Sequence, residues 1–347
     1  MGSVKDLIVI KAPEKEKSGI GRFIFSDRYS VFDWGEMPDK IEKKGAALCL
    51  TTAYFFEKLE EMGIKTHYLG LLKDNQLKKL KELKAPTNIM EIKLLRVLKP
   101  EIKNGHYDYS LYKKERKNFL IPLEIIYRNS LPEGSSVFKR LKEGILNLED
   151  LGLKEMPKPY TRLEKPIIEI STKLEATDRY ITFNEAKEIV NLSEKELVEI
   201  KEKTLLINSL ISKEVEKIGL FNEDGKVEFG FDEERNLILV DAVGTLDECR
   251  FTYEKIPVSK EIARNYYRKT LWYEEVEKAK KLDKINWKKL VKIKPPNLPK
   301  ELKTLIENIY LAYCNEITKR EWFSCPPLKE LLLSLKEFLL KDDKEYL

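Results

Sequence analysis

The spacing of apolar and polar residues predicts that the chain begins with short strands around one helix. Segments 4–10 and 22–26 are rich in β-branched and aromatic residues, which favours two strands joined by a turn that contains Ser18-Gly19-Ile20-Gly21. Between 46 and 62 apolar residues recur every three or four positions, so we expect a helix that ends at Gly63. Other apolar runs predict further strands at 66–73, 87–98 and 119–127.

The second half of the chain is predicted to contain more helix than strand. Helical periodicity over 184–217 precedes an alternating strand pair over 226–243. Three helical stretches follow, near 259–281, 298–316 and 327–341. Since strands and helices do not follow one another as βαβ units, the pattern favours an α+β fold. We expect an N-terminal antiparallel-sheet domain over 1–120 and a larger α+β domain with C-terminal helices over 121–347.

Charge and composition exclude several classes of protein. The 347 residues include 64 Lys and Arg against 59 Asp and Glu, and acids interrupt the densest basic runs, which is not the pattern of a nucleic-acid binder. The four cysteines share no CxxC spacing, so a reducing compartment is expected and no zinc site is indicated. No apolar run reaches the ~18 residues of a membrane span. We therefore expect a cytoplasmic protein, and the abundance of Lys and Glu favours a thermophilic source.

The most informative stretch is the strand pair that runs from Asp224 to Asp241. Apolar residues alternate there with Lys226 and Glu228, which is the period of a strand with one buried face. A four-residue loop over 233–236 would place Glu228 opposite Asp241 on the polar face, about 5 Å apart. Two facing carboxylates repel one another unless a cation lies between them, so the pair indicates a hard divalent ion such as Mg²⁺ bridging nucleotide phosphates. The alternative is an ordinary exposed face of a hairpin.

Two neighbouring segments add charged and hydroxyl side chains. The segment after the hairpin brings Asp247 and Arg250 near its polar face, although such residues are more often a surface ion pair. Upstream, Arg128 follows a predicted strand and precedes a turn that contains Ser135 and Ser136. A guanidinium and turn hydroxyls suit a phosphate or a carboxylate. The same residues also occur in ordinary turns.

Taken in order, these segments resemble the phosphoribosylaminoimidazole-succinocarboxamide synthase (SAICAR synthetase) family over about residues 4–322. The most specific match starts at Asp224 and reads Asp-Gly-Lys-Val-Glu-Phe-Gly, which is similar to the family's Asp-x-Lys-x-Glu-Phe-Gly. The other matching segments are Phe25 to Asp33, Ile41 to Gly45, Gly63 to His67, Arg128 to Ser136, Ser171 to Asp178 and Asp241 to Arg250.

The resemblance implies an ATP-dependent ligase of purine biosynthesis that joins carboxyaminoimidazole ribonucleotide to L-aspartate and releases ADP and phosphate. ATP and Mg²⁺ would be its cofactors, the N-terminal domain would cover the nucleotide, and no nucleic acid or membrane partner is implied. A homo-oligomer stays open.

The resemblance also implies roles for individual residues. Glu228 and Asp241 would bind magnesium, and the nucleotide site would consist of these two residues with Lys11 and Lys44. Catalysis would fall to Asp224, Lys226 and Arg250. The substrates would contact Arg128, Ser135, Ser136, Lys173, Asp178, Asp247 and Arg250.

Three positions depart from the family pattern, namely Ala242 for Glu, Leu246 for Pro and Thr177 for His. They leave open a homologue that binds ATP and the ribonucleotide without turnover. A related ATP-dependent phosphotransferase, with a different pocket around Arg128 and Lys173, is also left open. In the inferred hairpin register Ala242 points to the apolar face, so an alanine at this position need not prevent metal binding by Glu228 and Asp241.

Overall fold

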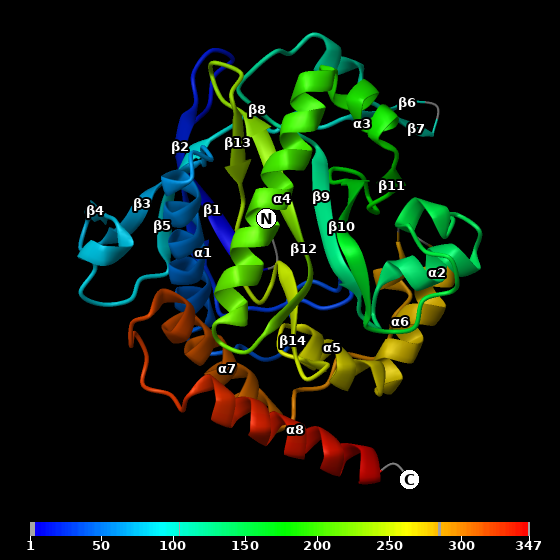
Figure 1. The fold of residues 1–347 in the computed structure, drawn as a ribbon. Helices are drawn as coiled ribbons and strands as arrows, with labels where there is room; N and C mark the ends of the chain where they lie inside the picture. Colours follow the sequence, from blue (N-terminus) through cyan, green and yellow to red (C-terminus); the bar gives the residue numbers. More distant parts are fainter. Residues whose placement is uncertain (1–3, 104, 284–285, 346–347) are drawn as a thin grey trace.

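The computed structural model describes residues 4–103, 105–283 and 286–345, and its N-terminal part is an antiparallel sheet (Figure 1). The strand order is β1-β2-β5-β3-β4. These strands are β1 (Lys5–Lys11), β2 (Gly19–Phe25), β3 (Tyr68–Lys73), β4 (Gln76–Lys78) and β5 (Ile89–Leu94). Helix α1 (Lys44–Glu61) packs against this sheet and against α7 (Lys300–Thr318), which explains why most of its residues are buried.

The second sheet is built around the long strand β12 (Phe221–Phe231). The first half of β12 lies between β9 (Leu123–Leu131) and β14 (Cys249–Tyr253), and its second half pairs with β8 (Phe119–Leu120) and β13 (Leu237–Val240). The remaining strands are β10 (Thr161–Thr172), β11 (Tyr180–Ile181), β15 (Ile256–Pro257) and the separate hairpin of β6 (Glu101–Lys103) and β7 (His106–Asp108). Because β12 is central, its side chains meet partners from distant parts of the chain.

Helices cover the second sheet and close the end of the molecule near the C-terminus. Figure 1 shows α4 (Glu194–Glu216) lying along the second sheet, with α7 and α8 (Leu328–Glu345) at the end that holds the C-terminus. The other helices are α2 (Ser136–Lys142), α3 (Phe183–Val190), α5 (Glu261–Arg268) and α6 (Leu271–Leu282). No helix in the described part of the chain is long and apolar enough to cross a membrane.

One continuous apolar core joins the two sheets. It contains Met90 of β5, Phe55 of α1, Phe251 of β14 and Ile309 of α7. The domain boundary expected near residue 120 therefore does not coincide with a break in the core, and β8 on its N-terminal side already pairs with β12. The division into two domains stays a prediction.

The predicted α+β class is confirmed, and most predicted elements exist with shifted ends. The helix expected over 184–217 is divided at Asn191, where φ is 56°, and Ser193 then caps α4. The helix expected over 259–281 is divided at Thr270, whose hydroxyl caps α6. Local capping residues thus end and restart helices that periodicity alone joins.

The turn expected at 18–21 is wrong, because Gly19 and Gly21 lie inside β2. The connection between β1 and β2 lies before them. A Cβ atom at Gly19 would lie 2.2 Å from the carbonyl oxygen of Lys11, so glycine is required by the close approach of the two strands.

The predicted register of the β12–β13 hairpin is wrong by one residue. Glu228 pairs with Val240 instead of Asp241, because the loop has three residues rather than four. Asp232 and Asn236 close it with a backbone hydrogen bond of 3.0 Å. Arg235 adopts the left-handed conformation, with φ of 63°, that commonly completes a three-residue hairpin loop.

Candidate active site between the two sheets

A cluster of acidic and basic side chains lies around the middle of β12. Lys226 forms ion pairs with Glu228 (2.8 Å), with Glu124 of β9 (3.0 Å) and with Glu248 (3.3 Å). Lys173, just after β10, approaches Glu228 to 2.5 Å. Burial works against the charge of Lys226, yet the surrounding carboxylates hold the pKa of Lys226 well above its ordinary value. The cluster thus keeps its lysine charged.

Asp241 joins this cluster through an uncommon backbone conformation. Its φ is 67°, a region that residues other than glycine rarely adopt. Its carboxylate forms an ion pair with Lys5 of β1, and its carbonyl accepts a hydrogen bond from Nε2 of His67 at 3.2 Å. Although burial favours the neutral acid, the charges of Lys5, Lys226 and Lys173 hold the pKa of Asp241 well below its usual range. Burial lowers the pKa of His67 to about 4, so the ring is neutral and Nε2 can carry the donated proton.

Glu228 is the second carboxylate of the cluster, and its side chain is only 3% exposed. Burial raises the pKa of Glu228, Lys226 and Lys173 oppose the rise, and the negative charge of Asp241 adds to it. The two carboxylates therefore lie close enough to interact although the strands do not pair them directly. Hard oxygen donors of this kind fit Mg²⁺. Among the described residues no group of three or more Asp, Glu, His or Cys side chains could hold a metal, so an ion here would need phosphate or water as further ligands.

An apolar cavity of about 160 Å³ opens beside these carboxylates, between the two sheets. Leu7, Phe23 and Ile92 line it from the first sheet, and Leu120 and Val240 line it from the second. The charged residues at its wall are Lys93, Lys173, Glu228 and Asp241. An apolar slot bordered by a few convergent charged groups suits a flat base linked to phosphates.

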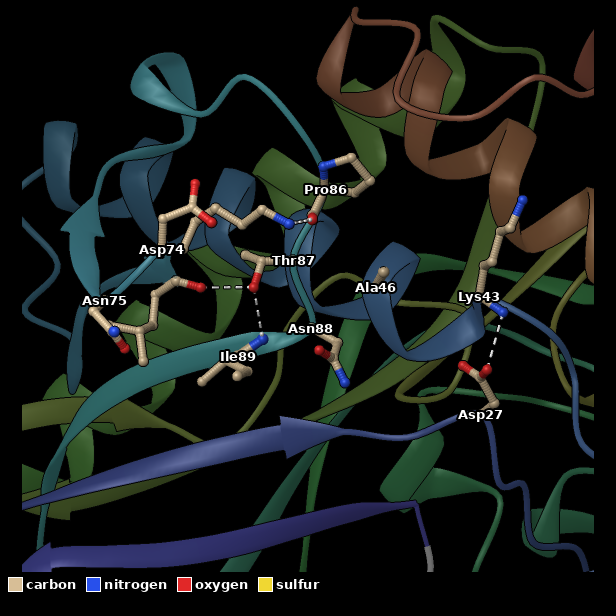
Figure 2. A pocket seen from close by; sticks show the side chains of 11 residues that line it. Asp27, Lys43, Ala46, Asp74, Asn75, Pro86, Thr87, Asn88 and Ile89 are labelled. Carbon is tan, nitrogen blue, oxygen red and sulfur yellow. Dashed lines mark hydrogen bonds between the residues drawn. The ribbon is translucent and has the colours of Figure 1, made fainter.

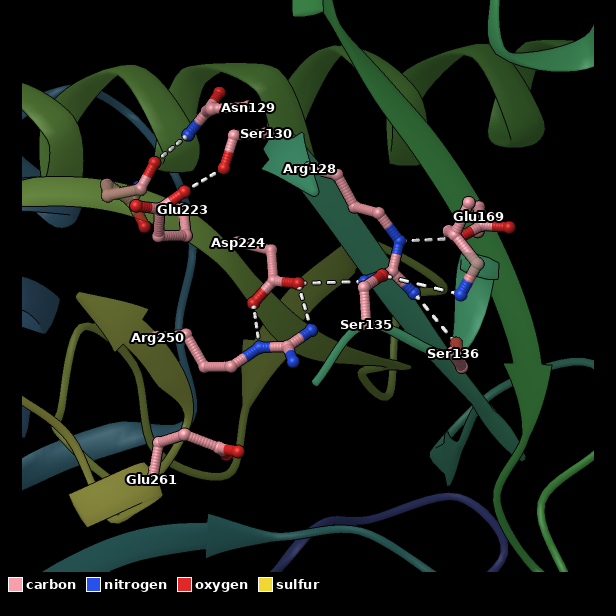
Figure 3. A network of polar contacts seen from close by, with 12 residues as sticks. Arg128, Asn129, Ser130, Ser135, Ser136, Glu169, Glu223, Asp224, Arg250 and Glu261 are labelled. Atoms are coloured by element: carbon pink, nitrogen blue, oxygen red, sulfur yellow. Dashed lines mark hydrogen bonds and ion pairs between the residues drawn. The ribbon is translucent and has the colours of Figure 1, made fainter. Parts of the chain in front are cut away.

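A second charged cluster lies at the start of β12 and is centred on Asp224 (Figure 3). Asp224 lies opposite Arg128 of β9 on one side and Arg250 of β14 on the other. Nη1 of Arg128 donates to its carboxylate at 2.8 Å, and Nε of Arg250 donates at 2.7 Å. Asp224 is 4% exposed, so two guanidiniums share one buried carboxylate. The nearby acids Glu124 and Glu248 form ion pairs with Lys226.

Arg128 is buried and bonded on most sides. Besides Asp224, it donates to Glu169 at 2.5 Å, to Tyr180 at 3.1 Å and to Ser136 at 3.4 Å. Arg128 therefore donates four hydrogen bonds within the protein, and an arginine side chain has only about five N–H donors. In this arrangement Arg128 holds Asp224 in place and offers little to a ligand.

The turn before α2 lies against the other guanidinium. Ser135 caps α2. The residue before it is Gly134, and because glycine has no side chain, the guanidiniums of Arg250 and Arg268 can both come close to this turn. A Cβ atom at Gly134 would lie 3.5 Å from Nη1 of Arg250 and 3.1 Å from Nη2 of Arg268, with Glu261 at 2.9 Å. Glycine thus lets the turn approach two guanidiniums, which suit a phosphate or carboxylate. In the structure the carboxylate of Glu261 lies against the same turn and pairs with Arg268 at 2.6 Å. Sequence reasoning missed Arg268, and no local signal distinguishes it from other arginines.

Lys44 and Asp247, expected to bind the nucleotide and the substrates, pair with each other inside the protein. Their ion pair measures 2.7 Å, and the hydroxyl of Tyr310 donates to Asp247 at 2.6 Å. Lys44 has no exposed surface, so the structure does not bring it to the cavity. Although burial opposes the charge, Lys44 and Lys260 lower the pKa of Asp247 to about 2.

Lys11 and Asp178 lie at the margin of the site. Lys11 is exposed at the end of β1, about 20 Å along the strand from Lys5. Lys5 is the residue of β1 that reaches the carboxylates, and sequence reasoning missed it. The signal was its spacing of two residues from Leu7, which places both side chains on the same face of the strand. Asp178 lies in an exposed loop, where partial burial and the charge of Glu124 raise its pKa to about 6.

A separate cavity of about 470 Å³ lies near the start of α1 (Figure 2). Asp27 accepts hydrogen bonds there from the backbone N–H groups of Lys43 (3.1 Å) and Gly45 (3.0 Å), which fixes the first turn of α1. Lys73 donates to the carbonyl of Pro86 at 3.1 Å. These hydrogen bonds are structural contacts, and no predicted site residue lines the cavity.

Comparisons with known proteins point to one family. A family model described as SAICAR synthetase matches residues 2–283. A protein of Archaeoglobus fulgidus with the provisional name phosphoribosylaminoimidazole-succinocarboxamide synthase is 55% identical over 98% of this chain and all of its own length. The structure of SAICAR synthase from Saccharomyces cerevisiae, complexed with SAICAR, has a TM-score of 0.63 at 22% identity and covers 93% of this chain and 95% of its own. A SAICAR synthetase in complex with ADP has a TM-score of 0.55 at 23% identity over 86% and 99%.

The fold is that of the solved SAICAR synthetase structures. The chain belongs to the SAICAR synthetase family. It is an ATP-dependent ligase of purine biosynthesis.

Proposed function

We propose that this chain joins the carboxylate of carboxyaminoimidazole ribonucleotide to the amine of L-aspartate while ATP is converted to ADP and phosphate. The observation that carries the proposal is the order of three side chains on β12. Asp224, Lys226 and Glu228 alternate on one face, so an arginine cluster, a central lysine and a carboxylate pair follow one another over about 13 Å. The names of the relatives, and the SAICAR and ADP in the two solved structures, support this assignment.

The nucleotide belongs at the end of β12 that carries Glu228. Its base would occupy the apolar cavity, and Glu228 and Asp241 would hold magnesium on its phosphates. When bound, the ion would offset negative charge during phosphoryl transfer. Lys5 and Lys173 neutralise these carboxylates in the structure, and we expect them to turn towards phosphate oxygens when the nucleotide is present.

The ribonucleotide belongs at the end that carries Asp224. Arg250, beside the turn at Gly134, would bind its phosphate or carboxylate, and Asp224 fixes the orientation of the Arg250 fork. Lys226 lies between the two ends. Its charge is therefore placed to stabilise the phosphoryl group as it passes from ATP to the carboxylate.

A homologue without turnover is less well supported, because two of the three departures lie in the core. Ala242 is 6% exposed and Leu246 is fully buried, and both belong to the apolar cluster that joins the sheets. The carboxylates of Glu228 and Asp241 remain together without a glutamate at 242. Thr177 lies in an exposed loop.

The proposal includes a cytoplasmic location in a thermophilic cell. All four cysteines are free, which suits a reducing compartment, and the chain is rich in Lys and Glu. Whether copies of the chain associate is left to direct measurement.

The test is ADP release with each substrate omitted in turn, with the product identified by mass spectrometry. We expect ADP to appear only when the ribonucleotide and L-aspartate are both present, in step with a succinocarboxamide product. ADP release that ignores both substrates would reject the ligase. Tight binding of ATP and ribonucleotide without product would favour the homologue that lost turnover.

A further inference from the structure

The turn over 244–250 carries two side chains of the proposed site. It connects β13 to β14 and places Glu248 3.3 Å from Lys226. It also leads into β14, where Arg250 lies opposite Asp224 of β12 and donates to it through Nε at 2.7 Å. The position of this turn therefore influences where a carboxylate and the start of β14 stand relative to β12.

The turn is closed by bonds to Thr245. The carbonyl of Thr245 accepts hydrogen bonds from the backbone N–H groups of Cys249 at 3.0 Å and Glu248 at 3.3 Å. Its hydroxyl accepts two longer ones of 3.3 Å from the backbone N–H groups of Asp247 and Glu248. Gly244 has a φ of 68°, and a Cβ atom there would lie 2.3 Å from a ring carbon of Phe55. The turn is thus pressed against α1, and short contacts from other elements must hold it.

Lys44 of α1 supplies one such contact through its ion pair with Asp247 at 2.7 Å, and two more come from one face of α7. Tyr310 and Tyr313 lie three residues apart, which places them side by side on the helix. The hydroxyl of Tyr313 donates to the carbonyl of Gly244 at 2.6 Å, and the hydroxyl of Tyr310 donates to Asp247 at 2.6 Å. Both rings are nearly inaccessible to solvent, at 3% and 2% exposure, so water cannot readily replace either bond. The family model ends before α7, at residue 283.

We propose that α7 is a positioning element for the reaction: Tyr310 and Tyr313 fix the 244–250 turn and thereby set the guanidinium of Arg250 against the ribonucleotide. This inference rests on the proposed function. Neither tyrosine touches a substrate, and each acts through the turn that it anchors.

The experiment compares Tyr310→Phe, Tyr313→Phe and the double variant with the wild-type enzyme. Each change removes one hydroxyl and keeps the ring, so the packing of α7 is preserved. In the double variant we expect KM for the ribonucleotide to rise roughly tenfold, because a buried charge-assisted hydrogen bond is lost. KM for ATP should stay within about twofold, since the ion pairs of Glu228 and Asp241 are with Lys226, Lys173 and Lys5, which lie outside the turn.

Tyr54→Phe is the matched control. Tyr54 lies in α1, and its hydroxyl donates a hydrogen bond of 2.8 Å to the carboxylate of Glu214. This variant therefore also removes a buried hydroxyl that bonds a carboxylate, but at a place away from the turn. It should lower thermal stability as much as Tyr310→Phe and leave both KM values unchanged.

The proposal is overturned if the tyrosine variants lose stability and keep the wild-type KM for the ribonucleotide. It is also overturned if both KM values rise together. Should the double variant fail to fold, Tyr310→Phe decides between the same outcomes. A failure of the proposed function is distinguishable, because the wild-type enzyme would then show no ribonucleotide-dependent ADP release.

Discussion

At the scale of single residues, the site depends on buried carboxylates that are shared between cations. Asp224 lies between two guanidiniums and Glu228 between two lysines, and neither carboxylate is open to solvent. The alternation of charged and apolar residues in β12 predicted which side chains share a face. It could not predict the partners Arg128 and Arg250, which come from strands almost a hundred residues upstream and about 25 residues downstream.

Replacing Asp224 by Asn tests this sharing. The change keeps the size of the side chain and removes from Arg250 the buried carboxylate that it shares with Arg128, while Arg128 keeps its ion pair with Glu169. We expect the free energy of unfolding to fall by about 3 kcal/mol and KM for the ribonucleotide to rise. Urea unfolding and steady-state kinetics measure the two effects.

Glu169→Gln is the control, because Glu169 bonds Arg128 and Arg140 but not Arg250. It should lower stability without a comparable change in KM. If Asp224→Asn leaves KM for the ribonucleotide at the wild-type value, Asp224 does not orient Arg250 for binding.

At the scale of elements, strand and helix positions followed from periodicity, and the errors arose where distant contacts decide. The β12–β13 loop contains no glycine to mark its left-handed residue. Arg235 adopts that conformation while its guanidinium bonds Glu196 of α4, a contact that the local sequence does not reveal. β10 was not predicted, because Pro166 interrupts its apolar run and its pairing with β9 is irregular there.

The β1–β2 hairpin gives a prediction at this scale. Gly19→Ala would place a methyl group against the backbone of Lys11 and Pro13, which cannot yield without moving β1. We expect a loss of about 1 to 3 kcal/mol in the free energy of unfolding. Gly21→Ala, in the same strand, would meet the flexible side chain of Leu7 at 3.1 Å, so its loss should be smaller.

Chemical unfolding of the two variants decides the matter. Equal losses would show that the close approach of β1 to β2 at Gly19 does not constrain the hairpin.

At the scale of the whole molecule, the two sheets share one core and meet at His67. Its backbone N–H donates to Leu239 of the second sheet (2.9 Å), and its carbonyl accepts from Lys93 of the first (2.7 Å). Its neutral ring donates to Asp241. The family resemblance included His67 in a motif but gave no reason for it, and the structure supplies one: the residue joins the sheets beside the carboxylates.

The depressed pKa of His67 predicts how stability depends on pH. In the folded protein this pKa is about 4, against an ordinary value of 6.5, so the unfolded chain binds the proton more readily. This difference has no effect above pH 6.5 and favours unfolding increasingly as the pH falls towards 4, by up to about 3 kcal/mol. In urea unfolding, the stability advantage of the wild-type enzyme over His67→Gln should shrink by that amount between pH 7 and pH 4. A constant difference would mean that His67 can be protonated in the folded protein.

The central claim is that β12 separates a nucleotide subsite from a ribonucleotide subsite, and one set of calorimetric titrations tests it most directly. ATP with magnesium, and separately the ribonucleotide, are titrated into the wild-type enzyme, Glu228→Gln and Arg250→Lys. Glu228→Gln should weaken the binding of ATP with magnesium at least tenfold and leave the ribonucleotide nearly unchanged. Arg250→Lys loses the two-point contact with Asp224 and the Nη1 donor that faces Gly134. It should weaken the ribonucleotide roughly ten- to a hundredfold and leave ATP nearly unchanged. If either variant weakens both ligands equally, or weakens only the other ligand, the assignment of the two subsites is contradicted.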